Sequence, residues 1–175
     1  MDPTVEALWV RWWCNPWSWA HPVRQHRFAE SCGLTVGECD ALMACRHSVF
    51  LESVGIAPAQ PAVADTAVLD WLTLTPVQRE QAIGLAQLIC FTRYESDGPD
   101  GPWCWALAKA LRPAVWLPAD VYDARLLLGA WLGSQHWSRL RLAWPPGEVA
   151  DVPCEAPENK LQTLWRAILW RVTAA

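Results

Sequence analysis

Three cysteines and one histidine in the first third of the chain have side chains that can bind a metal or take part in nucleophilic catalysis: Cys32, Cys39, Cys45 and His47. Thiolates and imidazole nitrogens are preferred zinc ligands, and four of them complete a tetrahedral site. The cysteines are separated by seven and six positions, however, and lack the Cys-x-x-Cys pair that marks recognised zinc sites. Cys39 and Cys45 are also expected on different faces of one helix. The pattern therefore favours free thiols that pack as small hydrophobic side chains, with no bound metal or other cofactor.

A thiol enzyme is the second chemistry that these residues could support, since a histidine can activate a cysteine as a nucleophile. The chain has four histidines, but no local spacing pairs one of them with a cysteine. The sequence also lacks the glycine-rich phosphate loop, the Gly-x-Ser-x-Gly elbow and the His-Glu-x-x-His pair. We therefore predict that the chain is not an enzyme, and a thiol- or metal-dependent enzyme remains an alternative.

Tryptophan is the most unusual feature of the composition, with fourteen residues against three Phe and two Tyr. Five of them lie between residues 9 and 19, where few polar groups accompany them. A platform that stacks sugars or bases needs exposed rings beside polar groups that fix the ligand, so core packing is the preferred interpretation. An exposed interface for another protein is the alternative. The tryptophans predicted to form the structural core are Trp9, Trp12, Trp13, Trp17, Trp131 and Trp165.

The charge of the chain argues against nucleic acid as a partner. The formal net charge is −4, and only two of the fourteen basic residues are lysine. Phosphate binding depends on clustered basic side chains, which this composition does not supply. The charge is divided unevenly: residues 28–100 hold ten acidic and three basic residues, a net −7, and residues 103–144 hold five basic and two acidic residues, a net +3. Opposed charge of this kind suits protein partners.

The chain is expected to be cytoplasmic. No apolar run approaches the roughly 18 residues needed to cross a bilayer, and the N-terminus has no positively charged signal region. Seven cysteines without regular spacing indicate reduced thiols rather than a disulfide framework.

The secondary structure of the chain is predicted to be helical. Fourteen prolines divide the chain into short segments, in which apolar residues recur mostly at helical spacing. Capping boxes begin helices at Thr35 and at Thr75, and the second helix is expected to run to about Tyr94. A polar connector at residues 145–157 precedes a C-terminal amphipathic helix, whose apolar face is Leu161, Leu164, Trp165, Ile168, Leu169 and Val172. These patterns predict an all-α fold in a single helical domain over residues 1–175.

Residues 137–144 form the one stretch with period-two alternation, which predicts a short β segment or a final helical turn. The alternation places Arg139 and Arg141 together on one side. Guanidinium groups can each bind a carboxylate with two hydrogen bonds, which favours an acidic protein surface. We therefore predict that Trp137, Arg139 and Arg141 bind a partner protein, with a solvated edge as the alternative.

The stretch from Tyr122 to Pro145, in one-letter code YDARLLLGAWLGSQHWSRLRLAWP, resembles the SctK family of type III secretion accessory proteins, called HrpD in some plant-pathogen systems. Family members have an acid-rich helix start, a helix with a small residue, Gly, an aromatic residue and Leu, and then a basic-Leu alternation that ends in Pro. Residues 11–22, RWWCNPWSWAHP, are similar in their order of aromatic residues, Cys and Pro. The chain departs from the family in its shorter middle and C-terminus, and in having Trp at many aliphatic positions.

The resemblance implies a non-enzymatic adaptor of a bacterial type III secretion system, which serves protein transport and virulence. The implied partners are the cytoplasmic domain of the inner-membrane ring protein (SctD-like), the pod protein (SctQ-like) and the ATPase regulator (SctL-like). The implied location is cytoplasmic and peripheral to the inner membrane, without direct membrane insertion. A secretion chaperone is the alternative; it would form a dimer and have an α/β pattern, which the sequence does not favour.

Overall fold

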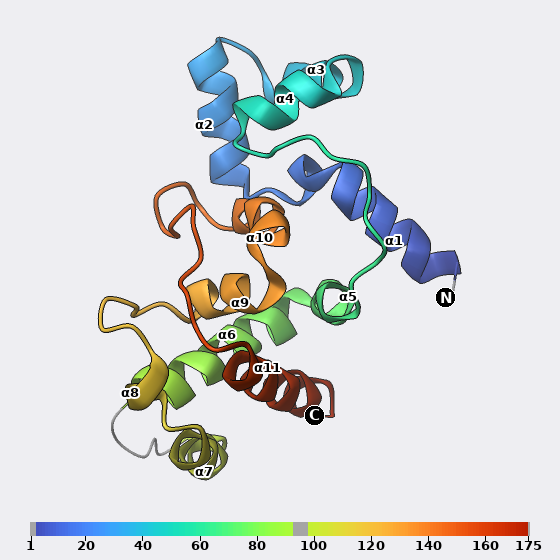
Figure 1. Ribbon diagram of the computed structural model, residues 1–175. Helices are drawn as coiled ribbons and strands as arrows, with labels where there is room; N and C mark the ends of the chain where they lie inside the picture. The colour runs from blue at the N-terminus through green and yellow to red at the C-terminus, as the bar shows by residue number, and fades with distance from the viewer. Residues whose placement is uncertain (1–2, 93–97, 175) are drawn as a thin grey trace. The chain divides into compact units, whose positions relative to one another are not determined.

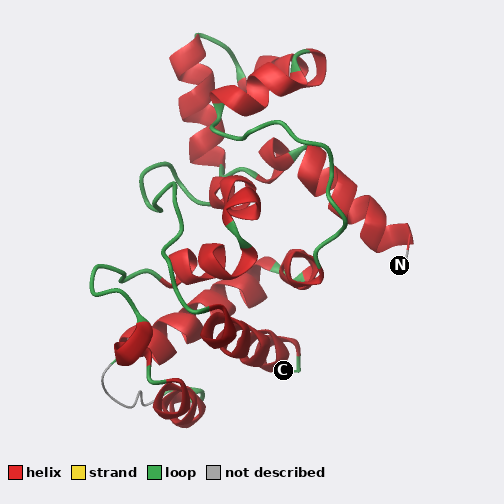
Figure 2. Ribbon diagram, viewed as in Figure 1, coloured by secondary structure: helices red, strands yellow, loops and turns green. Residues whose placement is uncertain are grey.

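Helices make up all the regular structure of the described chain (Figures 1 and 2). The computed structural model describes residues 3–92 and 98–174, and it contains no strand within those ranges. The predicted all-α fold is confirmed. Residues 137–144 lie in α10 (Ser134–Leu140) and the 3-10 helix η2 (Arg141–Ala143) with the residue that follows, so this segment is helical and not a β segment.

The chain divides into two compact units, each made of two stretches that are distant in sequence. The first unit comprises Met1–Asp65 and Gln135–Asp151, and the second comprises Thr66–Ser134 and Val152–Ala175. The sequence predicted one helical domain over residues 1–175 and gave no sign of this division.

The first unit begins with short helices that prolines and a glycine delimit. Pro16 opens a 3-10 helix after α1, Gly33 ends α2 in the left-handed conformation with φ of 66°, and Thr35 begins α3. The Thr35 capping box is confirmed: its Oγ1 accepts from the Glu38 amide at 3.2 Å, and its own amide donates to the Glu38 carboxylate at 2.7 Å. The helices in the first of its two stretches, Met1–Asp65, are α1 (Pro3–Cys14), η1 (Pro16–Trp19), α2 (Pro22–Cys32), α3 (Val36–Cys45) and α4 (His47–Ser53).

The tryptophans of α1 are buried. Trp9, Trp12 and Trp13 are 1–2% exposed, which confirms their predicted place in the core. The indole N–H of Trp9 donates to the Ala62 carbonyl at 3.0 Å, and that of Trp13 donates to the Ala59 carbonyl at 2.9 Å. Each acceptor directly follows a proline. The backbone of this proline-rich segment therefore satisfies the polar edge of two buried rings.

Trp17 belongs to a second cluster in the same unit and is 1% exposed. Its ring meets Phe28 and Phe50 edge to face, with centroids 5.3 and 5.2 Å away. Trp19 is only half-buried. The other buried members of this cluster are Ala20, Ala29, Cys39, Met43, Phe50, Leu51, Ile56 and Leu142.

The second unit is a bundle of longer helices. Thr75 begins α6 with the predicted capping box, in which Oγ1 accepts from the Gln78 amide at 3.3 Å. This helix ends at Phe91, and Tyr94, the predicted end, lies outside the described residues. The helices of this unit are α5 (Thr66–Thr73), α6 (Pro76–Phe91), α7 (Gly101–Leu111), α8 (Pro113–Trp116), α9 (Ala124–Leu132) and α11 (Glu158–Thr173).

Trp165 lies at the centre of the second unit with no exposed surface. Its indole N–H donates to the Leu127 carbonyl at 3.2 Å, and the Trp71 ring meets it edge-on. Trp131, which the sequence placed in the core, is half-buried and stacks on Trp165 with a centroid distance of 6.1 Å. All six apolar positions predicted to share one face of the C-terminal helix are buried.

The predicted connector at residues 145–157 contains no helix, which agrees with its prolines and glycine. No helix in the described part of the chain has both the length and the apolar character to span a bilayer.

Candidate functional site

Arg139 is buried, so the prediction that it projects toward a partner is wrong. It is 2% exposed. Its Nε donates to the Trp13 carbonyl at 3.3 Å, and its guanidinium carbon lies 4.0 Å from the centre of the Trp13 ring. Burial lowers the pKa of this guanidinium. The physical reason for the error is the helix: residues two apart share a face in a strand, but in a helix they point about 200° apart.

Trp137 is also buried, with no exposed surface, and therefore cannot contact a partner directly. Its indole N–H donates to the Ala150 carbonyl at 3.1 Å, and its ring packs against Trp144 with a centroid distance of 5.8 Å. Trp137 and Arg139 are thus parts of the core of the first unit, in place of the interface predicted for them.

Arg141 alone among these three residues lines a surface cavity of the first unit. Its side chain is 11% exposed and forms an ion pair with Asp151, whose own side chain is 79% exposed. Nη2 of Arg141 donates to the Val54 carbonyl at 3.4 Å. Its Nε is buried and has no hydrogen-bond partner among the described residues.

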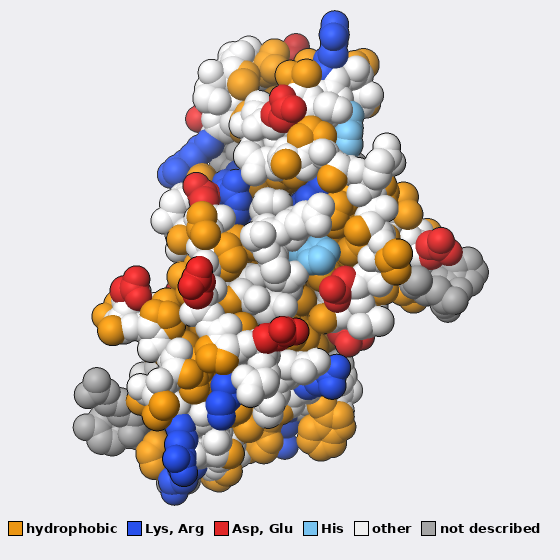
Figure 3. All heavy atoms as spheres, in the orientation of Figure 1, with side chains coloured by type: hydrophobic (Ala, Val, Ile, Leu, Met, Phe, Trp, Pro, Cys, Tyr) orange, Lys and Arg blue, Asp and Glu red, His pale blue; other side chains and the backbone are white. Residues whose placement is uncertain are grey.

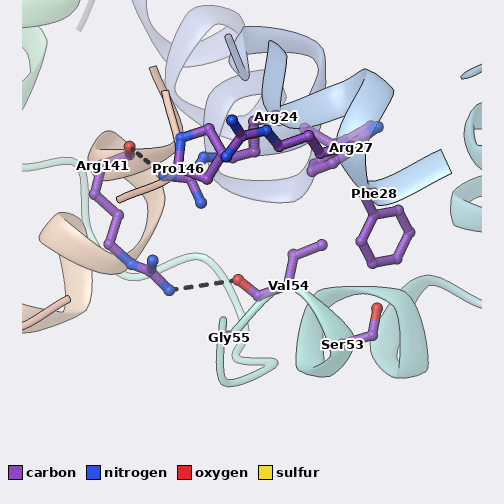
Figure 4. Close-up of a pocket in the computed structure, with 9 residues that line it drawn as sticks. Arg24, Arg27, Phe28, Ser53, Val54, Gly55, Arg141 and Pro146 are labelled. Carbon is purple, nitrogen blue, oxygen red and sulfur yellow. Dashed lines mark hydrogen bonds between the residues drawn. The ribbon is translucent and has the colours of Figure 1, made fainter. Parts of the chain in front are cut away.

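Three arginines line this cavity, which we call the arginine cavity (Figure 4). Arg24 and Arg27 come from α2, whereas Arg141 comes from η2 and lies beside the Val54–Gly55 turn. The volume of the cavity is about 380 Å³. Its lining residues are Trp17, Arg24, Arg27, Phe28, Ser53, Val54, Gly55, Arg141 and Pro146.

The backbone holds Arg24 in place at the edge of the cavity. Its Nε donates to the Trp144 carbonyl at 3.2 Å, and its Nη2 reaches the Arg141 carbonyl at 3.5 Å. Burial, and then the positive charge of Arg141, lower the pKa of Arg24. The carboxylate of Asp151, which pairs with Arg141, acts in the opposite direction and raises the pKa of Arg24.

Gly55 allows the close approach of Arg141 to the backbone. Its φ is 77°, a backbone conformation that residues with a side chain rarely adopt. A Cβ atom at this position would lie 2.6 Å from Nη2 of Arg141. The glycine therefore leaves the space that this guanidinium occupies in the arginine cavity.

Sequence reasoning did not single out Arg24 and Arg27. The signal that could have found them is their spacing: residues three apart lie on the same side of a helix, and α2 begins directly before them at Pro22. Their proximity to Arg141 depends on a contact between stretches more than a hundred residues apart. Local patterns carry no information on such a contact.

The cysteines and histidines do not converge on a site. Cys39 is fully buried, Cys32 and Cys45 are exposed, and His47 bonds the Cys14 carbonyl. In residues 3–92 and 98–174, no three His, Cys, Asp or Glu side chains are grouped as metal ligands.

Burial raises the pKa of the Cys39 thiol, and that of Cys90 to about 12. A nucleophilic cysteine needs the opposite shift, since the thiolate is the reactive form.

The outer surface mixes side chains of all kinds. On the face shown in Figure 3, acidic, basic and hydrophobic side chains are interspersed. Comparison of the chain with protein family models, with curated proteins and with solved structures gave no match.

Proposed function

We propose that the chain is a non-enzymatic helical adaptor of a type III secretion sorting platform, joining an SctD-like ring protein to an SctQ-like pod protein, with an SctL-like protein nearby. The resemblance to the SctK family rests on residues 11–22 and 122–145. One observation carries the proposal: the ends of these two stretches pack on each other in the first unit. Arg139 donates to the Trp13 carbonyl at 3.3 Å, and the His21 amide donates to the Leu142 carbonyl at 2.8 Å.

The two stretches that carry the resemblance therefore contribute to one packed region of the first unit.

The alternatives fit the geometry less well. A secretion chaperone would have an α/β pattern, whereas the described chain is all helical. A thiol enzyme would use a cysteine as nucleophile, but Cys39 lies in an apolar core where its pKa is raised.

The partner contact fits α3 and α4 better than residues 137–144, whose predicted contact residues Trp137 and Arg139 are buried. These two helices pack against each other. They carry two exposed carboxylates, Asp40 and Glu52, and two exposed apolar side chains, Leu42 at 40% and Val49 at 63%. Exposed acidic groups on these helices suit a partner with a basic surface.

Binding kinetics test the proposal. The chain is immobilised, and the SctD-like cytoplasmic domain and SctQ-like protein encoded in the same genome are passed over it. We expect saturable binding, and the double variant D40K/E52K should slow association by about tenfold at low salt, since charges at a rim act mainly on the association rate. The matched control is D70K/E155K, which makes the same charge change at exposed positions of the second unit.

The control should bind at the parental rate. A genome without such partners, or purified partners that fail to bind the parental chain, would contradict the adaptor function. Equal rates for both double variants would leave the adaptor in place and remove α3 and α4 as its contact surface.

A further inference from the structure

The arginine cavity carries an excess of positive charge. None of its nine lining residues is acidic, and three are arginines. Asp151 pairs with Arg141 from outside the lining. Three positive charges and one negative charge leave a net charge of +2 at the cavity. Arginine is the residue best suited to bind oxyanions, because its guanidinium presents several N–H donors in a fixed plane.

Several donors at the cavity have no protein partner. Nε of Arg141 and Nε1 of Trp17 are buried without a hydrogen bond to any described residue. Arg24 donates through Nε and Nη2 only. The Arg27 side chain is exposed and forms no hydrogen bond or ion pair with the described residues. Because each guanidinium has five N–H groups, the three arginines retain donors for a ligand.

The positions of the Arg24 and Arg141 guanidinium groups are set before any ligand arrives. Carbonyl groups of the backbone hold Arg24 and Arg141, and Gly55 leaves the space that the Arg141 guanidinium occupies. Donors that are already ordered lose little conformational entropy on binding.

Most of the remaining wall of the cavity is apolar, with Ser53 as its polar side chain. Phe28, Val54 and Pro146 lie beside the arginines (Figure 4). The volume of about 380 Å³ falls near the lower end of the range for small-molecule sites, about 300–1,000 Å³. The occupant is therefore small and has an apolar or aromatic part next to its charged group.

We propose that the arginine cavity binds a small organic phosphate monoester, with the phosphate on Arg24, Arg27 and Arg141 and the organic part against Phe28 and Val54. The net charge of +2 matches a phosphate monoester, which carries a charge of about −1.5 to −2 at neutral pH, better than a carboxylate of charge −1. This site is independent of the proposed adaptor function, and either can fail without the other.

Calorimetric titration of the full chain with phenyl phosphate at pH 7.5 tests the site. Two further probes separate the contributions to binding: methyl phenyl phosphate keeps the ring and the phosphorus but has one charge less, and inorganic phosphate lacks the ring. We expect saturable binding of phenyl phosphate at one site per chain. Both other probes should bind about tenfold more weakly or worse, since each lacks one group that the cavity would contact.

Substitutions locate the site. Arg27→Gln removes an exposed donor without disturbing a contact of the fold, and it should weaken phenyl phosphate binding by about tenfold. Arg24→Gln should weaken it similarly, and Arg27→Lys should recover part of the loss because it keeps the charge. Arg46→Gln is the matched control, an exposed arginine of the same unit outside the cavity, and should bind as the parent does. Thermal unfolding of each variant verifies that it is folded.

Three results would overturn the proposal. The first is no saturable binding of phenyl phosphate to the parental chain. The second is equal affinity for phenyl phosphate and its methyl ester, which would remove the dianion as the recognised group. The third is unchanged affinity in a folded Arg27→Gln variant together with a folded Arg24→Gln variant.

Discussion

Trp13 combines three interactions in one buried side chain. It is 1% exposed, its indole N–H donates to the Ala59 carbonyl, and its face lies against the Arg139 guanidinium. The ring therefore joins α1 to a proline-rich segment on one side and to α10 on the other. Its role is structural. Trp13 is therefore part of the core and not of a binding surface.

Replacement of Trp13 by alanine should lower the free energy of unfolding by about 3 to 5 kcal/mol, because it leaves a large cavity in the core. It also removes the partner of the Ala59 carbonyl and of the Arg139 guanidinium. Urea unfolding followed by circular dichroism measures the change. Trp170→Ala is the matched control, since that ring is 65% exposed, and it should shift stability by no more than about 0.5 kcal/mol. An unchanged urea midpoint for Trp13→Ala would mean that the ring is not part of the core.

At the scale of the helix, Arg139 connects α10 to α1. Its guanidinium bonds the carbonyl groups of Trp13 and Gln135, at 3.3 and 3.2 Å, and has no acidic partner among the residues described. Carbonyl dipoles and the face of an aromatic ring stabilise a buried cation, but they repel an anion. Replacing this cation by an anion should therefore lower the free energy of unfolding.

Arg139→Glu should therefore destabilise the first unit by about 3 to 5 kcal/mol, since the new carboxylate would face carbonyl oxygens, which cannot donate a hydrogen bond to it. Arg139→Met keeps the length of the side chain without its charge and should cost less. The same urea unfolding measures both, with exposed Arg46→Glu as the control, which should remain within about 0.5 kcal/mol of the parent. A urea midpoint for Arg139→Glu equal to that of the parent would mean that residue 139 lies at the surface, as the alternation in the sequence predicted.

Elements with local signals were predictable from the sequence. The capping boxes at Thr35 and Thr75 begin helices where predicted, because the atoms that form each box lie within four consecutive residues. The C-terminal helix buries its predicted face for a similar reason, since its own apolar residues recur with a period of about 3.6 residues.

The site was not predictable in the same way. Arg139 lies 126 positions from the backbone group that it bonds, and the alternation of residues 137–144 suits a strand as well as a helix. Arg24 and Arg141 meet across 117 positions. Only tertiary packing determines which of these arginines are buried and which line a cavity, and a single sequence does not report that packing.

At the scale of the whole molecule, tryptophan shares the core with aliphatic residues in both units. The first unit buries Trp9, Trp12, Trp13, Trp17 and Trp137, and the second buries Trp71 and Trp165. Most of the indole N–H groups among these rings donate to backbone carbonyls, so the large apolar surface is buried without an unsatisfied polar edge. The Trp17 ring, at the arginine cavity, is an exception.

We propose that the chain acts as an adaptor, and an adaptor must hold two partners at once. The most direct test is the mass of the complex that forms when the chain, the SctD-like cytoplasmic domain and the SctQ-like protein are mixed, measured by light scattering after size-exclusion chromatography. We expect a single peak that contains all three proteins, with a mass at least equal to their sum, and no such peak when the chain is omitted. Separate elution of the three proteins, or a complex of the two partners that forms equally well without the chain, would contradict the claim.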